Sequence, residues 1–255
     1  MDSFKGFFDI STGLSGEVIS SLIVMAILIV LSLIVAIQAH YQDPLKKPRG
    51  LLFLVEVGVK FFDKLVYEMM GKRFEGFGAY IMAVSAYLFI AFIFGLTGLP
   101  SPVTNLAVPL SLALCTFILI HATSVKYTKW GYFKRYIDPI PVFLPVNLIS
   151  MWAPLLSMTL RLFGNAISGW ALMSIVYWGL GNLSSLIFTF MPVIDEANNF
   201  NGIFIAPIVT PFLHAYFDLF SGFIQTTIFI FLTMINISIE APDEDIDGIS
   251  MEGER

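Results

Sequence analysis

Long uncharged stretches separated by short charged ones dominate this chain of 255 residues. The first, 18–39, is about 20 residues long, enough to span roughly 30 Å of hydrocarbon as a helix. A second uncharged stretch, 76–125, is divided by the segment 95–102, which is rich in glycine and proline. Two further spans, at 77–97 and 103–123, are therefore predicted as a helical hairpin over 77–123.

The segment 51–74 has a different pattern, because charged residues alternate with Leu, Val, Phe and Met. Glu56 with Lys60, and Lys64 with Glu68, are opposite charges four residues apart, so each pair shares one face of a helix. Charges at this density exclude a membrane span. The pattern instead predicts an amphipathic helix that lies at the membrane surface or docks on a partner.

The hydrophobic stretch 139–190 is too long for one upright crossing, because about fifty helical residues would reach about 75 Å. Prolines at its start and the glycines Gly179 and Gly181 predict a helix over about 145–177. A helix of that length fits a bilayer only if it is strongly tilted. The remainder, 183–190, is then expected to return across part of the membrane.

Another over-long hydrophobic segment, 203–240, follows a polar loop at 192–202, and an acidic tail, 241–255, ends the sequence. We expect the tail to be loose. The whole pattern predicts a single all-α membrane domain with about five crossing helices and one amphipathic surface helix. The helices within 139–240 are expected to be long and strongly tilted.

Composition agrees with this fold class, since 57% of the residues are hydrophobic and 13% are charged, against about 25% charged in soluble domains. Seven of the 14 lysines and arginines fall in 46–73 and four in 126–135, whereas the turns near 98–102 and 191–202 have none. By the positive-inside rule the two basic segments are cytoplasmic, so the N-terminus lies outside and the acidic tail inside. The single cysteine excludes an internal disulfide and a cysteine metal cluster.

Arg161 is the only charged residue between positions 139 and 194. A permanent cation at the centre of a membrane helix costs about 2.5–3.5 kcal/mol on insertion scales. Long uncharged runs on both sides leave little scope for the side chain to snorkel to an interface. We therefore expect Arg161 to have a functional role.

Polar side chains form one stripe on each of the last two hydrophobic segments when residues are placed at 100° intervals around a helix. The stripe on the first comprises Asn147, Ser150, Ser157, Arg161, Asn165 and Ser168. The stripe on the second comprises Thr210, His214, Asp218, Ser221, Gln225 and Asn236. Small polar residues commonly join membrane helices, but these two stripes carry the only cation and the only carboxylate of their segments. The pattern indicates a wet, charged surface, on which His214 is either a relay or a structural hydrogen-bonding group.

The sequence LRLFGN at 160–165 resembles the signature of subunit a of the rotary F-type ATP synthases, and FIQTTIFIF at 223–231 is similar to that family's last helix. The resemblance implies that Arg161 faces a ring of c subunits, with Asn165 and Gln225 as its polar neighbours and Asp218 on the ion path. It also implies peripheral-stalk b subunits and other ATP synthase subunits as partners, in a bacterial plasma membrane. The translocated ion would be H⁺ or Na⁺, with no cofactor, no metal, no nucleic acid and no catalytic site of its own.

The sequence departs from that family at two positions that bear on the path. Trp170 and Met151 stand where many relatives have an acid or a histidine. An alternative hypothesis is a secondary transporter with Arg161 as counter-ion for an anionic substrate, which predicts internal symmetry and paired broken helices. Neither is visible in the sequence, and no motif of an intramembrane enzyme is present.

Overall fold

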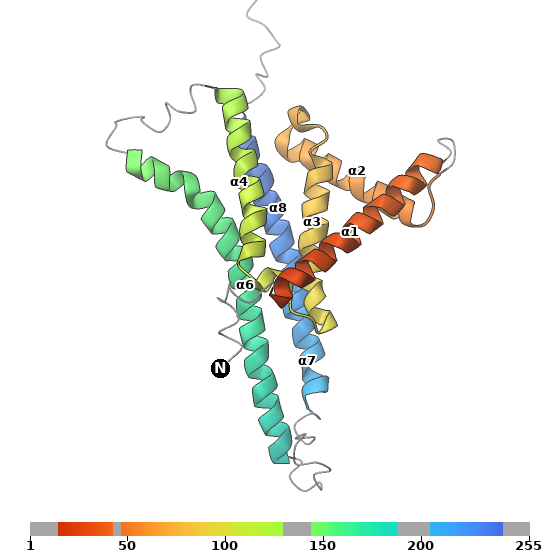
Figure 1. Ribbon diagram of the computed structural model, residues 1–255, viewed down its shortest axis with the longest axis vertical. Coiled ribbons are helices and arrows are strands. Elements are labelled where there is room, and N and C mark those ends of the chain that lie inside the picture. Colours follow the sequence, from red (N-terminus) through yellow and green to blue (C-terminus); the bar gives the residue numbers. More distant parts are fainter. Residues whose placement is uncertain (1–14, 43–46, 130–143, 188–204, 242–255) are drawn as a thin grey trace, which may run out of the picture.

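The computed structural model describes residues 15–42, 47–129, 144–187 and 205–241, and within these ranges it consists of helices without strands (Figure 1). The α-helices are α1 (Gly16–Tyr41), α2 (Leu51–Met70), α3 (Gly78–Ile93), α4 (Ala107–Thr128), α6 (Leu144–Ile187), α7 (Ala206–His214) and α8 (Ser221–Ile239). Short helical turns are η2 (Lys72–Phe74), η3 (Phe94–Thr97) and η4 (Pro102–Thr104), and the π-helical segment η7 (Ala215–Phe220) joins α7 to α8. In the described ranges, five helical runs are long and apolar enough to cross a membrane. The predicted fold class is confirmed.

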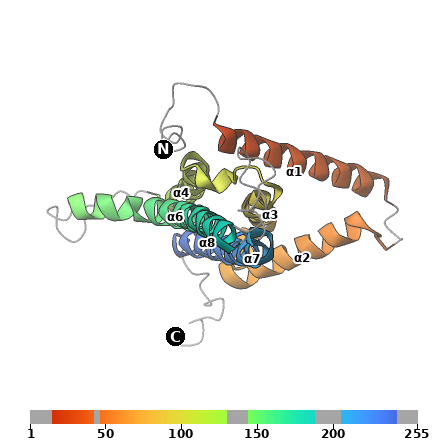
Figure 2. The same cartoon turned by 90° about the horizontal axis from the view of Figure 1, so that it is seen from below.

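Helices α3, α4, α6 and α8 form the centre of the molecule. Helix α6 and the continuous run α7–η7–α8 lie side by side along its longest axis in both views (Figures 1 and 2). Helix α2 crosses α3 and α8 at a steep angle, and α1 contacts α3 from the side opposite to α2 (Figure 2). The start of α1 meets η4 in the turn between α3 and α4 and lines a cavity together with residues of α6, α7 and η7.

Two clusters of buried side chains hold this arrangement together. The first joins α3, α4, α6 and α8 and includes Leu88, Phe92, Phe117, Leu155, Met158, Leu162 and Phe229. The second joins α2, α3, α4 and α8 and includes Val66, Met70, Ile81, Ile120, Met234 and Ile237. Since Leu155, Met158 and Leu162 recur every three or four residues, they define one buried face of α6. That face fixes the rotation of the helix about its axis.

The first two helices show the surfaces expected from their patterns. In α1 only Ser20 and Val24 are buried, and apolar side chains face outward around the rest of the helix. A helix that is apolar all round suits hydrocarbon surroundings. In α2 both predicted ion pairs are present: Lys60 contacts Glu56, and Lys64 lies 3.7 Å from Glu68.

The prediction that α6 ends near residue 177 is wrong. The helix continues through Gly179 and Gly181 to Ile187, for 44 residues. Each glycine costs a helix only about 1 kcal/mol relative to alanine, which is too little to end a long hydrophobic helix. Residues 183–187 therefore extend α6 instead of returning across the membrane. The predicted loop at 192–202 and the tail from 242 onward lie outside the described residues.

The segment predicted as one helix over 203–240 is helical from Ala206 to Ile239, but its hydrogen bonding changes within it. Pro211 removes one backbone donor inside α7, and the π-helical η7 follows directly after that helix. A π turn contains more residues than an α turn, so side chains before it are rotated relative to those after it. The second polar stripe, drawn at a constant 100° per residue, is consequently divided at η7.

Candidate functional site

Arg161 lies on the exposed side of α6. Its sequence neighbour Leu162 is 1% exposed in the core cluster, so successive positions of the helix place the guanidinium away from that core. The side chains around it are apolar and exposed, with Leu156 at 55% and Leu160 at 59%. Its Nη2 atom donates a long hydrogen bond of 3.4 Å to Ser157 Oγ, one turn earlier. The arrangement presents a cation on an exposed surface of α6 that carries apolar side chains and the hydroxyl group of Ser157.

Polar side chains join α6 to the start of α8 beside Arg161. Asn165 Nδ2 donates to Ser221 Oγ at 2.8 Å, and the Ser221 hydroxyl is 3.1 Å from Asn165 Oδ1. One turn along α8, Gln225 Nε2 donates to the backbone carbonyl of Arg161 at 3.4 Å. The Gln225 Oε1 atom is buried and has no hydrogen-bond partner among the described residues. The amide group of Gln225 thus supports the backbone that carries the cation and keeps one acceptor available.

A second polar group joins α6 to α7 and η7. His214 Nδ1 lies 2.6 Å from Asp218 Oδ2, and His214 Nε2 lies 2.8 Å from the Tyr177 hydroxyl. In the tautomer protonated at Nδ1, the imidazole donates to the carboxylate and accepts from the phenol. The Asp218 carboxylate also lies against Gly95, where an added Cβ would be 3.9 Å away. The carboxylate thus lies beside η3, which follows directly after α3.

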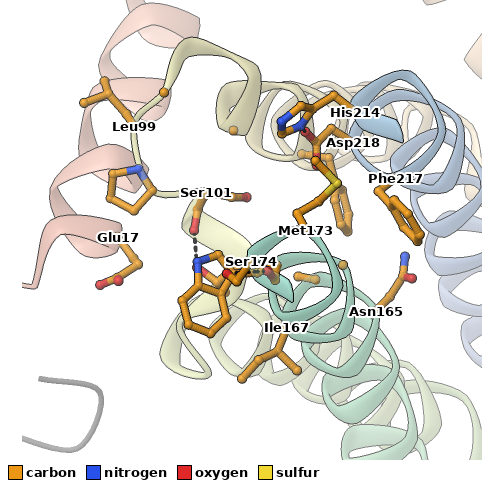
Figure 3. Close-up of a pocket in the computed structure, with 18 of the residues that line it drawn as sticks. Glu17, Leu99, Ser101, Asn165, Ile167, Met173, Ser174, His214, Phe217 and Asp218 are labelled. Carbon is orange, nitrogen blue, oxygen red and sulfur yellow. Dashed lines mark hydrogen bonds and ion pairs between the residues drawn. The ribbon is translucent and has the colours of Figure 1, made fainter. Parts of the chain in front are cut away.

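A cavity of about 540 Å³ connects these groups with the start of α1. At about 30 Å³ per molecule it has room for roughly fifteen or more waters. Its polar lining comprises Glu17, Ser101, Thr104, Asn165, Ser174, Tyr177, His214 and Asp218. In Figure 3, Glu17 lies on one side, His214, Asp218 and Asn165 on the other, and Ser101 and Ser174 between them. The described residues that line it include two carboxylates but no lysine or arginine.

The cavity brings together only part of the predicted site. Asn165, His214 and Asp218 line it, whereas Arg161 and Gln225 lie one helical turn beyond Asn165 and Ser221, respectively. Other polar groups of the two stripes bond within their own helices. Ser168 donates to the Asn165 carbonyl at 3.0 Å, and Thr210 donates to the Ala206 carbonyl at 2.8 Å. Asn147 lies near the start of α6, three turns and more from Arg161.

Two titratable residues of the cavity lining, Tyr177 and Glu17, were not predicted from the sequence. Tyr177 lies seven residues after Trp170, so both share a face of α6 and both line the cavity. That helical spacing could have indicated Tyr177. Glu17 belongs to a different helix, and nothing local in the sequence links it to Asp218. Met151 does not line the cavity and packs beside the first core cluster.

The described residues contain no group of three His, Cys, Asp or Glu side chains placed to hold a metal ion. The chemistry within reach is proton exchange among a carboxylate, an imidazole and a phenol, or attraction of a small cation to a carboxylate. Both processes need water, which the cavity has room to hold. The guanidinium of Arg161 supplies a fixed positive charge one helical turn from Asn165 in the cavity wall, since arginine keeps its proton in proteins.

Comparison with known proteins shows which family this chain resembles. Residues 18–238 match the model of the family described as ATP synthase A chain. The chain is 28% identical to ATP synthase subunit a of Mycoplasma pneumoniae, across 94% of this chain and 88% of that protein. It is 26% identical to ATP synthase subunit a of a Sulfurihydrogenibium species, across 85% and 94%. It is 24% identical to a protein of Propionigenium modestum named ATP synthase subunit a, sodium ion specific, across 93% and 79%.

Proposed function

This chain belongs to the ATP synthase A chain family, and on that premise we propose that it is the stator subunit that carries ions to and from a rotating ring of c subunits in an F-type ATP synthase. Members of this family are multi-pass membrane proteins that act in ion transport and ATP synthesis together with other ATP synthase subunits. In the proposed arrangement, two half-channels open to opposite sides of the membrane, and Arg161 separates them.

The observation that carries the proposal is the position of Arg161 on the exposed face of α6, beside apolar side chains such as Leu160 and one helical turn from Asn165 in the cavity wall. A cation there is costly if lipid covers it, at about 2.5–3.5 kcal/mol. The cost disappears if the surface faces a partner that brings carboxylates. A ring of c subunits, each with one carboxylate, is such a partner.

Electrostatics explain what the arginine does to each arriving carboxylate. A carboxyl group that faces lipid is held neutral, because desolvation disfavours its charged form. At about 4 Å from Arg161 and with an effective dielectric constant near 20, the ionised form gains about 4 kcal/mol. The pKa of the ring carboxylate therefore falls beside Arg161, and the group releases its ion. The same fixed charge prevents ions from passing directly between the half-channels.

The cavity beside Asp218 supports an outer half-channel. It opens near the α3–α4 turn, which carries no lysine or arginine, and the positive-inside rule assigns such turns to the outside. An ion would travel past Tyr177, His214 and Asp218 to Asn165. The inner half-channel would follow the other half of the α6 stripe, which includes Ser157 and Asn147, toward the cytoplasm. Each charge that crosses releases about 2.3 kcal/mol per 100 mV.

The ion is H⁺ or Na⁺. The polar groups of the cavity suit either one, and a relative in Propionigenium modestum is named as sodium ion specific. The same orientation puts the N-terminus outside, the C-terminus in the cytoplasm, and α2 on the cytoplasmic side. There α2 presents exposed side chains such as Phe53 and Phe61, which suit membrane lipid and the b subunits of the peripheral stalk.

Replacing Arg161 in the assembled complex tests this function. Arg161→Ala is expected to abolish ATP-driven ion pumping while the complex still assembles, because no fixed charge then lowers the pKa of the ring carboxylate. Arg161→Lys should be nearly as damaging, since lysine loses its proton more readily when desolvated. Pumping is measured in membrane vesicles with a fluorescent gradient probe, beside the ATP hydrolysis rate of the same preparation.

Arg49→Ala is the matched control, because Arg49 is also an arginine outside the cavity but lies between α1 and α2. That variant should pump like the parent complex. Full ATP-driven pumping by an assembled Arg161→Ala complex would count decisively against the proposed function.

A further inference from the structure

Glu17 is a carboxylate that the ion path proposed above does not include. It occupies the first turn of α1 and lines the same cavity as Asp218, from the opposite side. Its side chain is partly exposed. Among the described residues that line the cavity, Glu17 and Asp218 are the only acids. The position of Glu17 thus adds a second negative charge to a cavity whose described lining carries no lysine or arginine.

Specific contacts hold the start of α1 at this place. Asn105 Nδ2 donates to Ser15 Oγ at 3.0 Å, which ties the residue before α1 to the end of the α3–α4 turn. Gly16 lies so close to Pro100 that an added Cβ would be 3.3 Å from its Cγ. Further along α1, the Ser21 and Tyr87 hydroxyl groups lie 2.7 Å apart. Glu17 is therefore part of a docked helix end, positioned by residues on both sides of it.

The electrostatics favour a cation at this end of the cavity. A carboxylate in the first turn of a helix is stabilised by the free N–H groups and the dipole of that turn. A cleft lined by charge of one sign concentrates ions of the opposite sign and raises their capture rate by about 10–10³-fold. The titratable groups that face Glu17 across the cavity are Tyr177 on α6, His214 on α7 and Asp218 on η7.

We propose that Glu17 is the outer ion-capturing carboxylate of this cavity, which takes a monovalent cation from the outside water and passes it toward Asp218. The inference rests on the proposed function and adds a station contributed by α1. For H⁺, a hydronium ion gives its proton to the Glu17 carboxylate and leaves as water; the resulting acid gives the proton, through water, to the Asp218 carboxylate. For Na⁺, the carboxylate acts as a counter-ion and no bond changes.

The same placement offers an explanation for the departure at Trp170. In this chain Trp170 fills part of the cavity wall, at a sequence position where an acid or histidine was expected from the family. Glu17 returns a carboxylate to the cavity from another helix. The cavity therefore contains a carboxylate, from Glu17, although position 170 does not supply one.

Glu17→Gln in the complete ATP synthase tests the inference. The variant keeps the size and polarity of the side chain and removes its charge. We expect the outside ion concentration needed for half-maximal ATP synthesis to rise about tenfold, the lower end of the capture effect, while the maximal rate changes little. A purely structural role for Glu17 would not produce this separation. Glu17→Asp should restore most of the ion affinity.

The measurement uses vesicles in which the H⁺ and Na⁺ concentrations are varied separately on the membrane face to which this cavity opens. The ion whose concentration dependence changes identifies the cation. Glu75→Gln is the matched control, because Glu75 is exposed after η2 and does not line this cavity. If Glu17→Gln matches the parent complex for both ions while Arg161→Ala still stops pumping, the Glu17 inference alone is overturned. If Arg161→Ala pumps normally, the proposed function fails as well.

Discussion

Asp218 shows how single residues acquire their properties from several helices at once. Its carboxylate contacts His214 one turn earlier and lies against the backbone of Gly95, while His214 in turn contacts Tyr177 on α6. One oxygen of the Asp218 carboxylate is hydrogen-bonded to His214, and the residue also lines the cavity. Such a carboxylate can both hold and release a cation. The neighbouring imidazole and phenol fix its orientation, which favours a hydrogen-bonded relay over an isolated charge.

Asp218→Asn should slow ion transport by about 10²-fold, the lower end of the contribution of a positioned acid–base group. The amide keeps the shape and a hydrogen bond to His214 but cannot take up the ion. Because Arg161 is intact, the remaining transport should stay coupled to ATP hydrolysis. The initial pumping rate and the ratio of ions moved to ATP hydrolysed are measured in vesicles. Glu68→Gln, an exposed change on α2, serves as control, and an unchanged rate in Asp218→Asn would remove Asp218 from the path.

At this scale the sequence predicted the residues whose signal is local. Arg161 stands out as a lone charge in a hydrophobic stretch, and Asn165 and Asp218 follow from helical periodicity. Glu17 could not be found in the same way, because its link to Asp218 depends on how separate helices pack. Contacts between positions far apart in the chain leave no periodic trace in a single sequence.

At the scale of elements, the junction of η7 and α8 decides how the two polar stripes meet. His214 at the end of α7 and Asp218 in η7 line the cavity, while Ser221 at the start of α8 bonds to α6. The close approach of Gly222 to Phe92 fixes this junction against α3. A Cβ at position 222 would lie 2.6 Å from the Phe92 Cβ, a separation that no larger residue can adopt without displacing a helix.

Gly222→Ala is therefore expected to weaken the packing of α8 on α3 by about 1–3 kcal/mol, the usual cost of overpacking. The temperature at which the detergent-solubilised complex loses this chain should fall. Gly179→Ala is the matched control, since an added Cβ there meets nothing within 4 Å and alanine favours the helix. Adding Phe92→Ala to Gly222→Ala should relieve the clash. Equal stability of the two single glycine variants would contradict this account of the junction.

The elements themselves were predictable because hydrophobic length and charge placement are strong signals. The ion pairs of α2 and the existence of five spans followed from them. The end of α6 was not predicted correctly. Two glycines cost a helix only about 1 kcal/mol each, which does not end a long hydrophobic helix. The π-helical segment left no signal beyond Pro211, since helical periodicity assumes a constant angle per residue.

At the scale of the whole molecule, the described chain has two different sides. On one side α1 and α2 flank α3 (Figure 2). The other carries the exposed face of α6 with Arg161 and apolar neighbours such as Leu160. If the proposed function holds, the ring of c subunits covers this second side, and the two half-channels approach it from opposite ends of α6.

Cysteine cross-linking in the membrane can locate the ring. In a background that carries Cys115→Ala, Leu160→Cys should cross-link to a small hydrophobic subunit, because Leu160 is 59% exposed beside Arg161. Ile34→Cys on α1 is the control, since Ile34 is 45% exposed but belongs to the other side. Mass spectrometry of the adducts identifies the partner. Cross-linking of the ring subunit to position 34 and not to position 160 would place the ring on the wrong side of the molecule.

The exposed guanidinium also has a consequence for biogenesis. A newly inserted copy without its companions would hold a permanent charge against acyl chains, at a penalty of about 2.5–3.5 kcal/mol that its own fold does not relieve. If the proposed ring of c subunits docks on this face, that penalty is removed and the inserted chain is stabilised. If the proposed function holds, the same exposed charge would also give quality-control proteases a physical basis to distinguish unassembled chains from assembled complexes.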